Sequence, residues 1–106
     1  MTNKISILKD LKNHLQTSFK ESVKDVILFG SQALGKANKD SDYDILVVLK
    51  NDYTAKDENL IFDLCYDISL RHNIVIDTHI ISEKELYSIK GKQPIFIKAI
   101  KSGIYA

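Results

Sequence analysis

The chain has 106 residues, of which 44% are hydrophobic and 27% are charged. This length predicts a single domain over residues 1–106, and the composition is typical of a globular domain rather than a disordered segment. Fifteen basic and 14 acidic residues leave a net charge of +1, so charge gives no indication of a nucleic-acid partner.

The lengths of the apolar runs indicate where in the cell the protein is located. The sequence contains no apolar run of the roughly 18 residues that a membrane helix needs, and its first residues lack the apolar block of a signal peptide. We therefore expect a cytoplasmic protein with no membrane partner.

Cys65 is the one cysteine and lies among apolar residues, so we expect it to fill the core.

The first half of the chain predicts a helix and two strands. A helix over 5–19 follows from apolar residues that recur every three or four positions, namely Ile5, Leu8, Leu11, Leu15 and Phe19. Short runs rich in β-branched residues predict buried strands at 25–30 and 43–49. We expect a short helix between these strands.

The second half predicts three more helices and one more strand. Thr54 and Asp57 form a capping box for a helix that ends near Asn73, with an apolar face of Leu60, Ile61, Leu64, Cys65 and Ile68. A strand is expected at 74–81. Ser82 and Glu85 then cap a short helix closed by Gly91, and a last helix runs from Pro94 to Gly103. This order predicts a small α/β (α+β) domain, with helices packed on a mixed sheet of three strands or slightly more.

The stretch "GSQALGKA" at 30–37 comes close to the Walker phosphate-binding pattern but lacks its final Ser or Thr. A Walker loop must open a long helix directly after its lysine. Here the next strand begins within six residues of Ala37, which leaves no room for that helix. We therefore reject the Walker interpretation.

Three aspartates favour a metal site instead. Asp42 and Asp44 are two residues apart at the start of a strand, so both carboxylates are expected to point to one face. Asp77 lies inside an apolar strand, where an unpaired carboxylate is costly to desolvate. Hard oxygen ligands select Mg²⁺ or Mn²⁺.

Each of these residues also has an ordinary structural explanation. Asp42 could be a turn residue, Asp77 could face solvent from an edge strand, and Ser31 could cap the short helix. His79 shares strand parity with Asp77, but a histidine with a satisfied or exposed side chain is the commoner case. The combination and order of the motifs favour the chemical interpretation.

The motifs "FGSQALG", "SDYDILVV" and "IVID" resemble, in order and spacing, the nucleotidyltransferase superfamily typified by DNA polymerase β, and most closely its minimal members. The resemblance implies the polymerase β-like nucleotidyltransferase fold. It also implies that Gly30 and Ser31 bind the β- and γ-phosphates of ATP. Asp42 and Asp44 would hold two Mg²⁺ ions, with Mn²⁺ as an alternative, and Asp77 would complete the catalytic metal site.

One position departs from the family pattern. Leu34 stands where these proteins usually carry arginine, so one phosphate-neutralising charge is absent. Two lysines close to the phosphate loop, Lys36 and Lys39, are candidates to replace it. We include Lys36 among the expected nucleotide-binding residues.

The resemblance implies a Mg²⁺-dependent enzyme that transfers AMP from ATP to a hydroxyl acceptor. Some minimal members act as antitoxins beside a HEPN-type toxin and attach AMP to a tyrosine of that toxin, so a HEPN-type toxin is the expected partner, with a homo-oligomer as the other option. The alternative function is a non-catalytic antitoxin or interaction module with a degenerate nucleotide site. The apolar C-terminal stretch at 93–106 is expected either to pack in the core or to form part of an interface.

Overall fold

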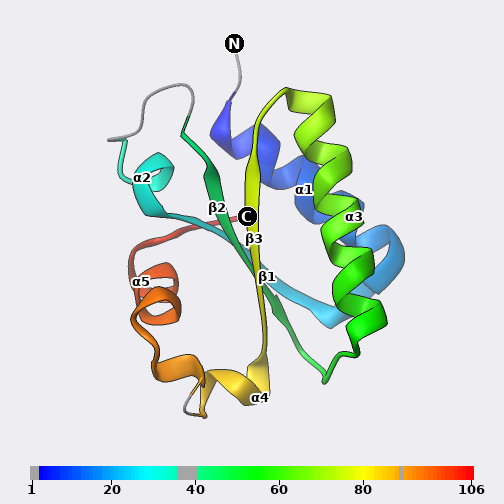
Figure 1. Cartoon of the computed structure of the whole chain (residues 1–106), viewed down its shortest axis with the longest axis vertical. Coiled ribbons are helices and arrows are strands. Elements are labelled where there is room, and N and C mark those ends of the chain that lie inside the picture. The colour runs from blue at the N-terminus through cyan, green and yellow to red at the C-terminus, as the bar shows by residue number, and fades with distance from the viewer. Residues whose placement is uncertain (1–2, 36–40, 89) are drawn as a thin grey trace.

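The computed structural model describes residues 3–35, 41–88 and 90–106, and in these residues a mixed sheet carries helices on both faces (Figure 1). The strand order is β3 (Ile76–Ser82), β2 (Tyr43–Leu49), β1 (Val23–Phe29) and β4 (Ile104–Tyr105). β2 and β3 run parallel, whereas β1 is antiparallel to both β2 and β4. The predicted mixed sheet and α+β class are confirmed.

Two long helices, α1 (Lys4–Phe19) and α3 (Ala55–His72), cover one face of the sheet (Figure 1). Their amphipathic periodicity was predicted correctly, but the buried stripe of α1 includes Ile7 while Ile5 is 47% exposed. Thr54 and Asp57 form the predicted capping box, and Asn73 ends α3 in the left-handed conformation. Cys65 is buried in this core, and burial raises the pKa of its thiol to about 11.

The other face of the sheet is covered by α5 (Pro94–Ser102), which packs through Phe96 and Ala99. A smaller core forms there from Ile27, Phe29, Leu46, Val48, Ile81, Phe96 and Ala99. The helix lies close to β1, since a Cβ atom on Gly103 would fall 2.3 Å from a methyl carbon of Ile27. The C-terminal isoleucines Ile97 and Ile100 remain 39% and 36% exposed, so only part of this stretch enters the core.

Several element boundaries differ from the sequence predictions. β1 ends at Phe29 because Gly30, with a φ of 75°, begins the single-turn helix α2 (Gly30–Ala33). β3 begins two residues later than expected. The prediction that Gly91 closes a helix was wrong: α4 (Glu83–Leu86) ends earlier, and a separate 3₁₀ turn covers Lys90–Lys92.

Two short elements were not predicted at all. A 3₁₀ turn at Lys20–Ser22 links α1 to β1, and β4 pairs with β1 through only two residues. A two-residue strand is too short to produce a recognisable alternation of apolar and polar residues. In the described ranges, no helix is long and apolar enough to cross a membrane.

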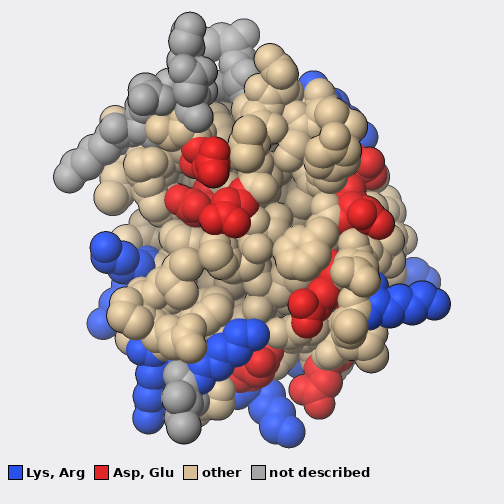
Figure 2. Space-filling model, viewed as in Figure 1, with Lys and Arg blue, Asp and Glu red and all other residues tan. Residues whose placement is uncertain are grey.

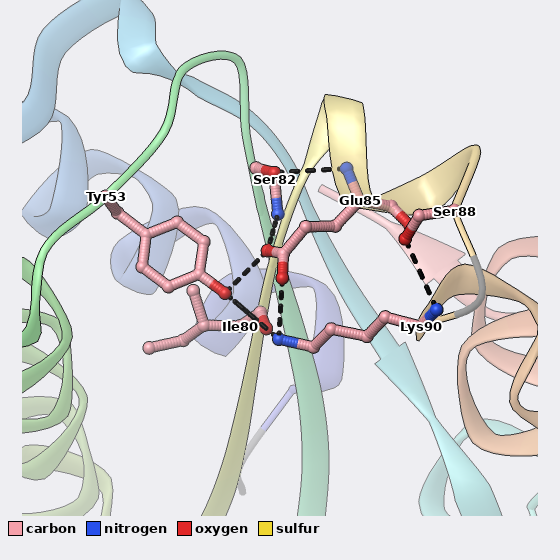
Figure 3. A network of polar contacts seen from close by, with 6 residues as sticks. All are labelled: Tyr53, Ile80, Ser82, Glu85, Ser88 and Lys90. Atoms are coloured by element: carbon pink, nitrogen blue, oxygen red, sulfur yellow. Dashed lines mark hydrogen bonds and ion pairs between the residues drawn. The ribbon is translucent and has the colours of Figure 1, made fainter.

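A polar network ties the loop before α3 to α4 and the turn that follows it (Figure 3). The Tyr53 hydroxyl donates to the Glu85 carboxylate at 2.7 Å, and the Lys90 ammonium donates to the Tyr53 oxygen at 3.1 Å. Lys90 also pairs with Glu85 at 3.2 Å. Burial alone would raise the pKa of Glu85, but the hydrogen bonds from Tyr53, Ser82 and Lys90 together lower it.

Removal of the Tyr53 hydroxyl is expected to destabilise the fold, because both Glu85 and Lys90 lose a hydrogen-bond partner. Tyr53→Phe should lower the free energy of unfolding by about 1.5 to 3 kcal/mol, because the hydroxyl bonds two charged groups and hydrogen bonds to charged groups contribute about that much. Urea unfolding measures it. Tyr87→Phe is the matched control, since Tyr87 is 81% exposed. Equal losses in the two variants would contradict a structural role for the Tyr53 network.

Candidate functional site

Two of the predicted aspartates are direct neighbours on adjacent strands. Asp44 on β2 pairs with Asp77 on β3 in the parallel ladder, and Phe29 on β1 lies opposite Asp44 on its other side. Paired residues on neighbouring strands point to the same face. That face is the one covered by α5, and Figure 2 shows acidic side chains grouped on the upper part of the molecule in the region of β2 and β3.

His79 joins this carboxylate pair. Ligand atoms of Asp44, Asp77 and His79 all lie within 4.8 Å of one another, and the His79 Nε2 is 3.3 Å from a carboxylate oxygen of Asp77. The His79 ring also lies 5.6 Å from the Phe29 ring, centroid to centroid. A donor set of two carboxylates and one imidazole can hold a divalent cation.

Asp42 borders this cluster. It immediately precedes β2 and its side chain is exposed. Among the described residues, the group of ligand atoms within 4.8 Å does not include the Asp42 carboxylate. Its negative charge nevertheless contributes to the raised pKa of Asp44, so it lies close enough to influence the pair.

The electrostatics of Asp44 reflect its crowded position. Burial raises the pKa of the Asp44 carboxyl, and the negative charge of Asp77 raises it further, while His79 opposes the shift. A pKa shift in this direction means that the folded protein disfavours the ionised carboxylate. A bound cation would relieve this unfavourable charge.

Gly30 lies directly against Asp44. A Cβ atom at position 30 would fall 2.2 Å from the Asp44 Oδ2, and the φ of 75° is one that side-chain-bearing residues rarely adopt. Ser31 follows on α2 and is exposed. The Gly-Ser pair recognised in the sequence therefore adjoins the aspartate pair in space.

A pocket of about 230 Å³ that Gly30 also lines opens between α2 and α5. Its walls include Phe29, Gly30, Ala33, Leu34, Ile95 and Lys98. Leu34 is 60% exposed, so its side chain is not needed for the core. The predicted nucleotide-binding residue Lys36, like Lys39, lies outside the described residues.

Comparison with known protein families shows which family the chain belongs to. A family model described as a nucleotidyltransferase domain matches residues 8–103. The chain belongs to this nucleotidyltransferase family. The resemblance seen in the sequence motifs is thereby confirmed, and the protein is a nucleotidyltransferase.

Two curated relatives come from Methanocaldococcus jannaschii, and both are provisionally named protein adenylyltransferases. One is 33% identical over 95 residues, which cover 81% of this chain and 96% of the relative. The other is 33% identical over 88 residues, which cover 83% of this chain and 82% of the relative. The nucleotidyltransferase chain thus corresponds to nearly the whole of the first relative.

Solved structures confirm the fold at lower identity. A spectinomycin adenyltransferase from Enterococcus faecialis superposes with a TM-score of 0.65 and 23% identity, covering 81% of this chain but 37% of that protein. A mutant of the toxin–antitoxin MntA-HpeT superposes with a TM-score of 0.62 and 14% identity. The match covers 98% of this chain and 72% of the matched chain. A structure described as a minimal nucleotidyltransferase superposes with a TM-score of 0.60 and 22% identity. The match covers 97% of this chain and 95% of that protein. The expected polymerase β-like nucleotidyltransferase fold is confirmed.

Sequence reasoning underestimated two residues. His79 shares parity with Asp77, and that signal could have placed it at the site, but parity alone does not distinguish a cluster member from an exposed histidine. Lys98 carried no local signal, because its place in the pocket that Gly30 also lines depends on how α5 packs on the sheet.

The close approach of Gly30 to Asp44 can be tested by substitution. Gly30→Ala should destabilise the fold more than Gly35→Ala, since both glycines have positive φ but only Gly30 has a neighbour in the way. The backbone conformation costs each variant about 1 to 2 kcal/mol. Urea unfolding compares them, and equal losses would mean that the Asp44 carboxylate simply moves aside.

The raised pKa of Asp44 predicts a pH-dependent cost in metal-free protein. Because the folded state holds the Asp44 proton more tightly than the unfolded state, stability is lost as pH rises through the ordinary range of an aspartate towards the folded pKa. Asp44→Asn should therefore gain stability relative to wild type as pH rises, most clearly at neutral pH with a chelator present. Unfolding free energies measured across pH check this. Asp63→Asn, an exposed change on α3, is the control, and a pH-independent difference for Asp44→Asn would contradict the prediction.

Proposed function

We propose that this nucleotidyltransferase carries out Mg²⁺-dependent transfer of AMP from ATP to a hydroxyl group of a protein. The observation that carries the proposal is the Asp44–Asp77 pair, set directly against Gly30 in a nucleotidyltransferase fold. The two relatives provisionally named protein adenylyltransferases support AMP as the transferred group and a protein as the acceptor.

The donor set fits the proposed metal. Asp44 and Asp77 supply hard carboxylate oxygens, and Asp42, close enough to influence Asp44, would add a third carboxylate. We propose that these three hold two Mg²⁺ ions, with Mn²⁺ as the alternative because it accepts the His79 nitrogen more readily. When bound, such ions neutralise phosphate charge and make the acceptor hydroxyl easier to deprotonate.

Gly30 and Ser31 are proposed to bind the β- and γ-phosphates. Without a side chain at position 30, phosphate oxygens can approach the backbone N–H groups closely, and the exposed Ser31 hydroxyl can donate a further hydrogen bond. Because α2 is a single turn, its dipole contributes little, and the contacts themselves must provide most of the binding. Lys36 remains a proposed contact in the segment that follows.

The chemical step requires a base for the acceptor. The Asp77 side chain is 55% exposed and held by His79, so it can receive the acceptor proton at its carboxylate. The acceptor oxygen forms a bond to the α-phosphorus, the bond to the pyrophosphate oxygen breaks, and pyrophosphate leaves with the electron pair. Asp77 thus matters mainly for transfer, while Asp44 matters for binding as well.

A tyrosine of a HEPN-type toxin is the proposed acceptor. The fold similarity to the toxin–antitoxin MntA-HpeT supports a toxin partner, and the exposed Ile97 and Ile100 offer apolar surface for such a contact. A second copy of this chain is the other proposed partner. In the non-catalytic alternative, the domain would only cover its partner and would need no nucleotide.

Transfer of label from ATP tests the activity directly. Incubation with host lysate, Mg²⁺ and ATP labelled at the α-phosphate should label a protein, whereas ATP labelled at the γ-phosphate should not. Asp44→Asn should abolish labelling because it removes a metal ligand. Asp77→Asn should reduce labelling by at least tenfold while ATP binding persists.

Two other outcomes have clear meanings. Labelling of a small molecule but of no protein would keep the nucleotidyl transfer and refute the protein acceptor. Labelling that is unchanged in Asp44→Asn would refute the proposed site.

A further inference from the structure

We infer that Lys98 on α5 binds the phosphates of the nucleotide and supplies positive charge that α2 lacks. The inference rests on the proposed function and adds to it a residue far from the sequence motifs. It concerns the pocket between α2 and α5, which shares Gly30 with the aspartate cluster.

The position of Gly30 joins the two sites. Gly30 lies against the Asp44 carboxylate and also lines the 230 Å³ pocket. A nucleotide held at Asp44 through its α-phosphate therefore has room to extend past Gly30 into this pocket. Whatever part of the nucleotide passes Gly30 meets the side chains contributed by α5.

Lys98 is the charged side chain in that pocket. The other lining residues that the structure describes are apolar, apart from Ser102, which lies one helical turn after Lys98. α2 itself contributes Ala33 and the exposed Leu34, neither of which can neutralise a phosphate. Among the described residues that line the pocket, the one cationic side chain therefore comes from α5.

Charge in this region creates the need for such a cation. Asp44 lies against Gly30, Asp77 and Asp42 are close enough to raise its pKa, and a triphosphate adds more negative charge. In the described ranges, no carboxylate forms an ion pair with the Lys98 ammonium, so it is available to a ligand. Lys4, which also lies near α2, is engaged because its ammonium donates to the Gln32 carbonyl.

The packing of α5 fixes where Lys98 stands. Phe96 and Ala99 are buried against the sheet, at 6% and 0% exposure, which sets the rotation of the helix. With that rotation, Lys98 and Ser102 line the pocket, while the exposed Lys101 does not. Figure 1 shows α2 and α5 on the same side of the sheet, as the shared pocket requires.

Nucleotide binding in four variants tests the inference. Calorimetry with Mg²⁺ and a non-hydrolysable ATP analogue should show Lys98→Ala binding on the order of ten- to a hundredfold more weakly, the range expected for one charge-assisted hydrogen bond. Lys101→Ala removes the same charge from the same helix and should change affinity by less than about twofold. Lys98→Arg should retain most of the affinity. Leu34→Arg, added to Lys98→Ala, should restore much of it, because position 34 lines the same pocket.

A comparison of ligands separates phosphate binding from general support of the pocket. The loss in Lys98→Ala should be several times larger for the ATP analogue than for AMP, because AMP lacks the β- and γ-phosphates. Equal losses for the two ligands would overturn the inference, as would equal affinities of Lys98→Ala and Lys101→Ala. A loss in Lys36→Ala with none in Lys98→Ala would assign the charge to Lys36 instead. If wild type binds no nucleotide at all, the proposed function itself fails, whereas wild-type binding unaffected by Lys98→Ala removes only the role of Lys98.

Discussion

The parallel pairing of β2 with β3 is the constraint on which the candidate site depends. In this register Asp44 lies beside Asp77, and His79 follows two residues later on the same face. A slip of one residue would turn Asp77 to the α1–α3 face, where the core is apolar. The register is held by the branched side chains that both strands bury, so the hydrophobic core determines where the carboxylates meet.

The cost of this arrangement is electrostatic. Burial and the charge of Asp77 raise the pKa of the Asp44 carboxyl. The metal-free fold therefore carries unfavourable burial and repulsion of carboxylate charge at its candidate site. The two hydrophobic cores, one under α1 and α3 and one under α5, must offset that cost. The same repulsion favours cation binding, which links the stability of the domain to the chemistry proposed for it.

The two faces of the sheet contribute differently to the site. α1 and α3 form the larger core and, through β2 and β3, fix the strands that carry the aspartates. α2 and α5 lie on the other face and shape the space beside Gly30. The network of Tyr53, Glu85 and Lys90 secures the chain between β3 and α5, so it indirectly fixes the helix that presents Lys98 (Figure 3).

The sequence by itself determined the helices and strands with strong periodicity, the capping boxes at Thr54 and Ser82, and the strand positions of Asp44 and Asp77, because these depend on neighbours in the chain. It did not determine β4, whose two residues form a strand only because β1 is beside them. It left the role of His79 open, because the alternation of side chains along a strand shows which face His79 lies on but not which residues it contacts. Only the tertiary structure decided that Asp42 borders the cluster, that Gly30 contacts Asp44 and that Lys98 lines the adjoining pocket. Those contacts join residues far apart in the chain, and their distances follow from sheet register and helix packing, which no local pattern of residues specifies.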